Sequence, residues 1–252
     1  MTAETLEIRS PASGELLATV PMADDREVEA AVASAGRGAA EMRRLPAHER
    51  AAMLARVAEA IEGEGEALAR LLASENGKPI RQTRGEVAAA VRIFRGFGEE
   101  AKRLFGRQIP LDAVPGLERH LAVTFREPLG VVAAIVPFNY PLELYAHKAA
   151  AALAAGNAVV VKPPEKCPLT VLRVAELVAA AGCPPDAHRV VVGGPRAAQQ
   201  LAASPGVQLV TLTGSTAAGR AISELAAQTL KKVHLELGGN DPMIVCADAD
   251  LD

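Results

Sequence analysis

GVVAAIVPFNYPLELYAHKAAAALAAGNAVVVK, residues 130–162, holds two nearly continuous apolar runs separated by a segment with helical spacing. An apolar run without polar alternation is typical of a parallel strand that is covered on both faces. The same pattern recurs downstream in RVVVGG, VQLVTLT and KVHLEL, with helical segments between the runs. Five strands joined by four crossovers predict a doubly wound α/β domain with a parallel sheet.

Two stretches of different character precede this domain. In residues 24–106, apolar residues recur every three or four positions, which predicts helices. In residues 109–127 the period changes, and Leu121, Val123 and Phe125 alternate with smaller or polar residues. This alternation predicts a half-solvated strand outside the main sheet. Such a strand needs a partner, which another subunit could supply.

The composition limits the classes of partner. With 252 residues, 50% of them hydrophobic, the chain is long enough to bury a sizeable core. A net charge of −3 and an aromatic content of 3% without Trp give no reason to expect nucleic acid. The longest strongly apolar stretch is about half a membrane span, and no signal peptide is visible. Three cysteines without CxxC or metal-ligand spacing suit a reducing compartment, so we expect a cytoplasmic protein without a membrane partner.

The residues just after each predicted strand are the first candidates for a site. Ligands of a doubly wound sheet bind beyond the carboxyl ends of its strands. Five turns could therefore line one crevice. They are PFNYP (137–141), KPPE (162–165), Gly193-Gly194, TGS (213–215) and ELGG (236–239).

Two of these turns have features of a nucleotide site. Ser215 follows a strand and opens a helix, so free N–H groups there could meet a pyrophosphate; a plain strand-to-helix turn is the alternative. Lys162 and Glu165 could bond the two hydroxyls of an adenine ribose, where an acidic group would repel a 2′-phosphate. A surface ion pair before a helix is the alternative for this second turn.

Two polar residues are candidates for catalysis. Asn139 lies between two prolines, so its amide could donate to a developing oxyanion, or it could merely satisfy its own turn. Glu236 is placed where a strand runs into a Gly-Gly turn, which can hold a carboxylate at the mouth of a sheet. His234 and Glu236 form an i, i+2 pair on one strand face, which we interpret as an ordinary strand pair. The five histidines show no metal-ligand spacing, and we predict no metal site.

The motifs PFNYP, KPPE, TLTGSTAAG and LELGGNDP, in this order and separation, resemble the aldehyde dehydrogenase superfamily. SENGKP upstream and ADADLD at the end look like further landmarks, so the resemblance covers essentially the whole chain. It implies an N-terminal helical part of the cofactor-binding domain at 1–108. It also implies an oligomerisation-type β segment at 109–127 and a Rossmann-like NAD-binding domain at 128–252. A homo-oligomer and a small aldehyde substrate are expected.

The resemblance also implies roles for single residues. A cysteine thiolate would attack the aldehyde, and Asn139 would stabilise the resulting oxyanion. Hydride would leave to the nicotinamide, and Glu236 would activate the water that hydrolyses the thioester. Glu165 favours NAD over NADP as the cofactor. The expected cofactor contacts are Ile135, Val136, Pro137, Phe138, Lys162, Pro164, Glu165, Gly194, Gly214, Ser215, Leu237 and Gly238.

This sequence departs from the family pattern in one respect, which concerns the nucleophilic cysteine. By resemblance it lies in a catalytic domain that follows the glutamate and that this sequence does not contain. Cys167, Cys183 and Cys246 do not match its position. We therefore expect the chain alone to be inactive or nearly so, with exposed apolar surface that promotes self-association. The alternative is a stand-alone NAD-binding module, or one subunit of a split enzyme, without turnover of its own.

Overall fold

The centre of the computed structural model, which describes residues 4–239 and 242–250, is a five-stranded parallel sheet. The strand order is β7-β6-β5-β8-β9, so the chain builds outward from β5 in one direction and then in the other. This reversal confirms the predicted doubly wound sheet and places its switch point between β5 and β8. The strands are β5 (Val131–Ile135), β6 (Ala158–Lys162), β7 (His188–Val190), β8 (Leu209–Thr213) and β9 (Lys232–Glu236).

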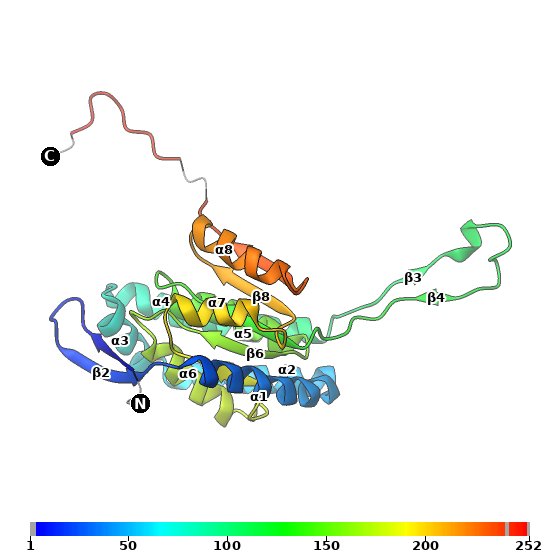
Figure 1. Ribbon diagram of the computed structural model, residues 1–252, viewed down its shortest axis with the longest axis horizontal. Coiled ribbons are helices and arrows are strands. Elements are labelled where there is room, and N and C mark those ends of the chain that lie inside the picture. Colours follow the sequence, from blue (N-terminus) through cyan, green and yellow to red (C-terminus); the bar gives the residue numbers. More distant parts are fainter. Residues whose placement is uncertain (1–3, 240–241, 251–252) are drawn as a thin grey trace.

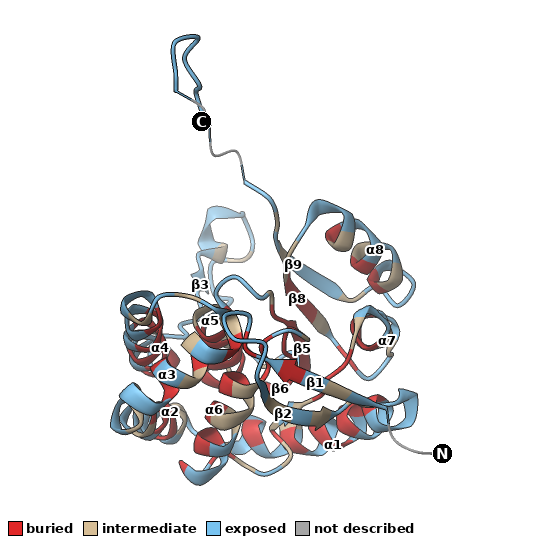
Figure 2. Cartoon of the chain, turned by 90° about the vertical axis from the view of Figure 1, so that its left-hand side faces the viewer, coloured by how far each residue is buried: buried red, intermediate tan, exposed pale blue. Residues whose placement is uncertain are grey.

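Helices cover both faces of the sheet, as the apolar strands require. β5 and β6 are buried along their whole length, whereas β9 is an exposed edge strand. Figure 2 shows α4 and α5 on one side of the sheet and α7 and α8 on the other. The four crossover helices are α5 (Pro141–Ala154), α6 (Leu169–Ala180), α7 (Pro195–Ala203) and α8 (Thr216–Ala227).

The N-terminal part adds a helical layer, which confirms the predicted helices. α4 packs between α2 and α5, and α1 packs against β6 and α7 on the other face. The continuous helical period in the middle of this part is divided at Glu64, whose φ is −100° and ψ 13°. The four helices are α1 (Asp25–Arg44), α2 (Ala47–Gly63), α3 (Gly65–Asn76) and α4 (Ile80–Ala101).

An antiparallel hairpin of β1 (Thr5–Arg9) and β2 (Leu16–Pro21) precedes these helices and was not predicted. Its side chains are mostly exposed or half-buried, and only Ile8 within the two strands is buried. Because the hairpin buries so little, its sequence carries no clear apolar alternation. Met22 and Ala23 then lead the chain to the sheet, where the Ala23 N–H donates to the Val192 carbonyl over 2.8 Å.

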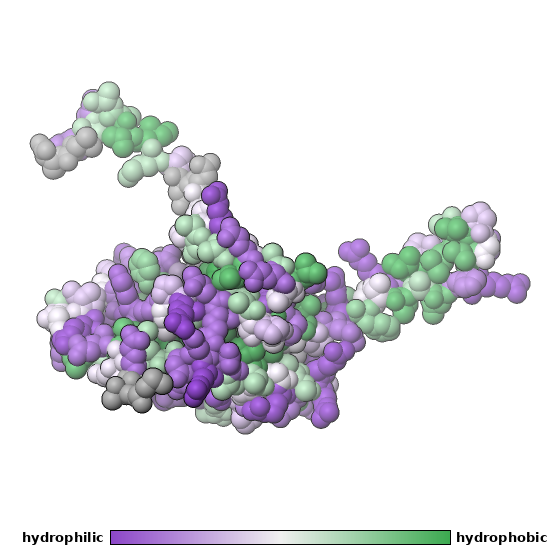
Figure 3. All heavy atoms as spheres, in the orientation of Figure 1, coloured by the Kyte–Doolittle hydropathy of each residue, from purple (hydrophilic) through white to green (hydrophobic). Residues whose placement is uncertain are grey.

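A second hairpin projects away from the body of the molecule (Figure 1). It contains β3 (Gln108–Ile109), the short 3-10 helix η1 (Leu111–Ala113) and β4 (Ala122–Val123). The predicted strand is present but shorter than its alternation indicated, because only two residue pairs form a ladder. Figure 3 shows apolar residues gathered along this projection. Phe125 is 82% exposed, so the apolar face of the hairpin lacks a cover in the described chain.

Candidate active site

The turns after the strands meet at one edge of the sheet, as expected from its topology. Ile135 pairs with Lys162 across β5 and β6, and Thr213 pairs with Glu236 across β8 and β9. The Gly214 N–H donates to the Glu236 carbonyl over 3.0 Å, which ties the last two turns together. The carboxyl ends of four strands therefore lie side by side at this edge.

The ribose candidates form an ion pair at the end of β6. Lys162 Nζ lies 3.0 Å from Glu165 Oε2, and Lys162 is only 5% exposed. Burial lowers the pKa of Lys162, while the Glu165 carboxylate opposes this shift. The alternative of a surface ion pair is therefore half correct: the pair exists, but its lysine is buried. Gly194 lies beside Glu165, since a Cβ on it would be 3.8 Å from Oε1.

The start of α8 has the geometry of an anion site. Ser215 Oγ accepts the Ala218 N–H over 3.2 Å, so the predicted N-cap is confirmed. The remaining free N–H groups of a helix N-terminus, together with the helix dipole, favour an anion. Gly214 and Ser215 lie next to the end of β9, where Leu237 and Gly238 follow Glu236.

The other expected cofactor contacts lie along the end of β5 and the start of the following loops. Ile135, Val136 and Pro164 are buried, so a ligand could reach them chiefly through their main chain. Pro137 is half-buried and Phe138 is 61% exposed. Within the motif LELGGNDP, Asn240 and Asp241 lie outside the described residues, and so does Asp252 at the end of ADADLD.

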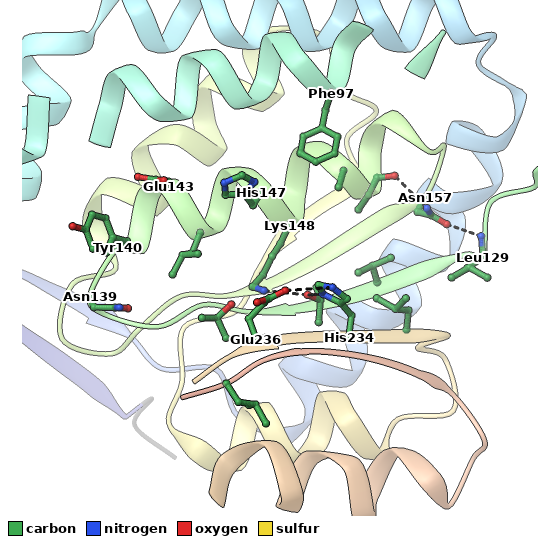
Figure 4. A pocket seen from close by; sticks show the side chains of 18 residues that line it. Phe97, Leu129, Asn139, Tyr140, Glu143, His147, Lys148, Asn157, His234 and Glu236 are labelled. Carbon is green, nitrogen blue, oxygen red and sulfur yellow. Dashed lines mark hydrogen bonds and ion pairs between the residues drawn. The ribbon is translucent and has the colours of Figure 1, made fainter. Parts of the chain in front are cut away.

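A cavity of about 880 Å³ opens beside these turns and holds both catalytic candidates. Its lining includes Asn139, His147, Lys148, His234 and Glu236. Figure 4 shows the side chains of Lys148, His234 and Glu236 close together, with Asn139 further along the cavity. The hydrogen bonds that hold the Asn139 loop are made elsewhere, at the Phe138 carbonyl and at main-chain amides of α5. The Asn139 amide is thus exposed at the cavity rather than used to close its own turn.

Glu236 ends the exposed strand β9 and is part of a polar chain across the sheet. His234 Nε2 lies 3.5 Å from Glu236 Oε1, and His234 Nδ1 lies 3.4 Å from Thr211 Oγ1. This agrees with the interpretation of an ordinary strand pair. Among residues 4–239 and 242–250, no group of three or more side chains could hold a metal ion.

Lys148 is a site residue that the sequence analysis did not identify. Its ammonium donates to Thr211 Oγ1 over 3.1 Å from a buried position on α5. Burial lowers the pKa of Lys148 to about 8, and the nearby charge of Glu236 opposes the shift. The available signal was a single lysine among the apolar residues of LELYAHKAAAALAAG, because an interior helix keeps such a charge only at a cost.

None of the three cysteines lines the cavity. Cys167 and Cys183 are buried, and burial raises the pKa of their thiols to about 11 and about 12. A thiol with such a pKa is almost entirely protonated at neutral pH and is a poor nucleophile. Cys246 is exposed on the C-terminal segment, which extends away from the sheet (Figure 1).

A doubly wound parallel sheet with a capped helix, a Lys–Glu pair and a cavity at its carboxyl edge is an arrangement typical of nucleotide-binding α/β proteins. The Asn139 amide and the Glu236 carboxylate line the same cavity. The sequence model of the Aldehyde dehydrogenase family matches residues 1–252, and the chain belongs to this family.

The relatives that match this chain are about twice as long as the chain itself. It is 43% identical over 250 residues to the mitochondrial succinate-semialdehyde dehydrogenase of Arabidopsis thaliana, covering 99% of this chain and 47% of that protein. The crystal structure of an Escherichia coli NADP dependent enzyme matches with a TM-score of 0.91 and 38% identity, covering 98% and 51%. A crystal structure of PnpE with nicotinamide adenine dinucleotide matches with a TM-score of 0.89 and 41% identity, covering 94% and 48%. The chain therefore spans about half the length of these relatives.

In the part of the chain that the structure describes, no helix has the length and apolar character needed to cross a membrane.

Proposed function

We propose that this chain is the cofactor-binding part of an NAD(P)-dependent aldehyde dehydrogenase that oxidises an aldehyde to a carboxylic acid. The observation that carries the proposal is the convergence of four groups at one edge of the sheet. Asn139 and Glu236 share a cavity, while the Lys162–Glu165 pair and the start of α8 lie at the ends of neighbouring strands. This arrangement fits a cofactor that crosses the edge toward a reacting carbonyl.

The residues present fit a dinucleotide. Lys162 and Glu165 offer a donor and an acceptor for two ribose hydroxyls, and the capped start of α8 would face a pyrophosphate. Glu165 favours NAD, because its carboxylate would lie against the 2′-phosphate of NADP. The relatives themselves include both cofactors by name, since one solved structure holds nicotinamide adenine dinucleotide and another is called NADP dependent.

The bound nicotinamide would supply the hydride acceptor, and the chain's own residues would handle charge and protons. The Asn139 amide would donate to the oxyanion that forms when a thiolate adds to the aldehyde. Glu236 would take a proton from the water that attacks the resulting thioester. Burial lowers the pKa of Lys148 to about 8 and the charge of Glu236 opposes this shift, so Lys148 would still carry a positive charge close to this carboxylate at pH 7.

The thiolate is proposed to come from the half of the relatives' length that this chain does not span. Cys167 and Cys183 are buried as neutral thiols, and Cys246 lies apart from the cavity. The small aldehyde substrate and an oligomer formed through the β3–β4 hairpin are proposed on the family resemblance.

Calorimetric titration of the purified chain with NAD and with NADP tests the proposal. We expect NAD to bind more tightly than NADP, and Lys162→Ala to abolish most of the heat. NADH formation from a panel of aldehydes should be absent or nearly so with the chain alone. A folded chain that binds neither cofactor would contradict the proposal. Turnover that stops on Cys246→Ala would instead place the nucleophile in this chain.

A stand-alone binding module is the second candidate, because the buried thiols of Cys167 and Cys183 are poor nucleophiles and the module needs none. The titration and the NADH assay together distinguish the two candidates after a protein that supplies the missing half is added. Turnover restored by that addition supports the enzyme, and continued binding without turnover supports the module.

A further inference from the structure

The turn of residues 75–79, Glu-Asn-Gly-Lys-Pro, joins α3 to α4 and contacts two loops of the candidate active site. One loop is 137–141, which carries Asn139, and the other is 163–170, which follows Lys162. Gly77 closes α3 with φ +83°, a conformation that favours glycine and reverses the chain. The side chains on both sides of this glycine can therefore reach the two loops.

Asn76 bridges the loops through one nitrogen atom. Its Nδ2 donates to the Phe138 carbonyl over 2.7 Å and lies 3.4 Å from Cys167 Sγ. Cys167 Sγ in turn lies 3.7 Å from the same Phe138 carbonyl. The three groups form a closed triangle that joins loop 137–141 to loop 163–170.

Lys78 and Glu86 hold the far end of the Asn139 loop. Glu86 is buried on α4, and its Oε1 accepts the Leu142 N–H over 2.9 Å and the Glu143 N–H over 3.2 Å. Lys78 Nζ lies 2.6 Å from Glu86 Oε2 and 3.7 Å from the centroid of the Tyr140 ring. The Glu86 carboxylate thus fixes the start of α5, and the Lys78 ammonium holds this carboxylate while it also contacts the face of the Tyr140 ring.

Glu75 holds the second loop in the same way. It is 2% exposed and accepts the Leu169 N–H over 2.6 Å and the Thr170 N–H over 2.8 Å. The Thr170 hydroxyl also donates to this carboxylate. These bonds satisfy the start of α6, which has no side-chain cap of its own. One turn therefore anchors both loops.

We propose that the turn 75–79 is a positioning element that fixes the Asn139 loop relative to the loop of Lys162 and Glu165, with Asn76 as its positioning residue. The inference rests on the proposed function, in which Lys162 and Glu165 bind the cofactor ribose and the Asn139 amide donates to the oxyanion of the reacting aldehyde. Asn76 acts through the Phe138 carbonyl and touches no reacting atom. Small displacements of such an amide slow a reaction strongly, because catalysis depends on its orientation.

A single tryptophan makes the position of this loop measurable. The chain has no Trp, so Phe138→Trp places one fluorescent reporter directly on the loop that Asn76 holds. Acrylamide quenching of this reporter is measured with and without saturating NAD. Asn76→Ala removes the bridge, and Asn76→Asp keeps the shape but has no N–H to donate. Ser74→Ala is the matched control, since Ser74 is exposed two residues away and its hydroxyl bonds only to the Arg70 carbonyl.

We expect quenching to increase in both Asn76 variants and to stay unchanged in Ser74→Ala. Loss of one hydrogen bond shifts a local opening equilibrium by about fivefold. Bound NAD should protect the tryptophan reporter from quenching in the control but much less in the Asn76 variants. In those variants, NAD bound at loop 163–170 would no longer fix the position of loop 137–141. The unfolding midpoint, followed by circular dichroism on the same proteins, separates local loosening from general destabilisation.

Two results would overturn the inference. One is equal quenching in the Asn76 variants and the control. The other is an increase in quenching that is fully explained by a lower unfolding midpoint of the Asn76 variants. The Asn76→Ala variant is expected to fold. Asn76 is the last residue of α3, and alanine has a high helix propensity. If the chain does not bind NAD, the proposed function fails, while the comparison without ligand still decides the role of Asn76.

Discussion

Lys148 is the residue at which stability and the candidate chemistry conflict. It lies on a helix whose other buried residues are apolar except for Tyr145, and burial lowers its pKa to about 8. The folded state therefore disfavours the charged form, whereas the unfolded chain keeps the ordinary value of 10.5. Stability linked to this group is lowest below pH 8 and rises as the pH increases from 8 to 10.5. A lysine kept under this penalty is typical of a functional position.

Replacing the lysine should make the protein more stable. We expect Lys148→Met to raise the free energy of unfolding at pH 7 by about 1–3 kcal/mol, because the buried charge is removed. The gain should shrink as the pH rises past 10.5, where Lys148 is mostly neutral in both the folded and the unfolded state. Urea unfolding at the two pH values measures this, with Lys232→Met on the exposed strand β9 as the control. A destabilised Lys148→Met protein would show that the bond to Thr211 outweighs the desolvation.

Glu165 is the residue that should decide between the two cofactors. Its carboxylate pairs with Lys162 at the expected ribose position, so a 2′-phosphate there would face a negative charge. We expect Glu165→Ser to raise the affinity for NADP by about tenfold relative to NAD, a change of about 1.4 kcal/mol. Parallel titrations with both cofactors measure the ratio, and Glu176→Ser on α6 is the control. An unchanged ratio would mean that the ribose lies elsewhere.

Single residues were predictable where a motif places them at the carboxyl end of a strand or in the turn that follows it. Asn139 and Glu236 both lie at the cavity for this reason, and the topology alone required it. Asn76 and Lys148 were missed because their partners are far away in sequence. Asn76 meets Phe138 across 62 residues and Lys148 meets Thr211 across 63, and no local pattern indicates such contacts.

At the scale of elements, α5 and β7 are joined by a pair in which Tyr145 is fully buried and His188 is partly buried. Tyr145 Oη lies 2.8 Å from His188 Nε2, and the two rings meet edge to face. Burial lowers the pKa of His188 to about 4, so the folded state holds the neutral ring. The unfolded chain takes up a proton at the ordinary value of 6.5. Stability is therefore lost as the pH falls from 6.5 to 4.

His188→Gln should remove this part of the acid sensitivity. The amide can still bond the Tyr145 hydroxyl but does not titrate. We expect wild type to lose up to about 3 kcal/mol more than the variant between pH 6.5 and pH 4, as the pKa difference implies. Urea unfolding across this range gives the two slopes. His48→Gln, which alters an exposed ring, is the control, and equal slopes in wild type and His188→Gln would refute the assignment.

Elements were predictable in proportion to the apolar surface that they bury. The parallel strands β5 and β6 are buried throughout, and their uninterrupted apolar runs indicated them. The hairpin β1–β2 buries almost nothing, and it left no periodic signal. The boundary between α2 and α3 was hidden for a different reason: at Glu64 the backbone leaves the helical conformation while the apolar period continues.

At the scale of the whole molecule, apolar surface without a cover is concentrated on the projecting hairpin. Leu121 is 76% exposed, Phe125 82% and Val123 48%, although each follows the alternation of a half-buried strand. The hairpin ladder has two residue pairs, which is too few for a stable isolated hairpin. A surface of this kind is typical of a site of association, and the same alternation in the sequence led us to expect a partner strand there.

We therefore expect the purified chain to self-associate at micromolar concentration, and the double variant Leu121→Glu, Phe125→Glu to shift it toward monomer. Charges on the apolar face would have to be desolvated in any contact, which disfavours association. Light scattering coupled to size exclusion measures the mass as a function of concentration. Leu230→Glu is the matched control, because Leu230 is 93% exposed just before β9 and far from the hairpin in sequence. A monomeric wild-type chain would refute the expectation. An equal shift toward monomer in the double variant and in Leu230→Glu would indicate non-specific hydrophobic association instead of a hairpin interface.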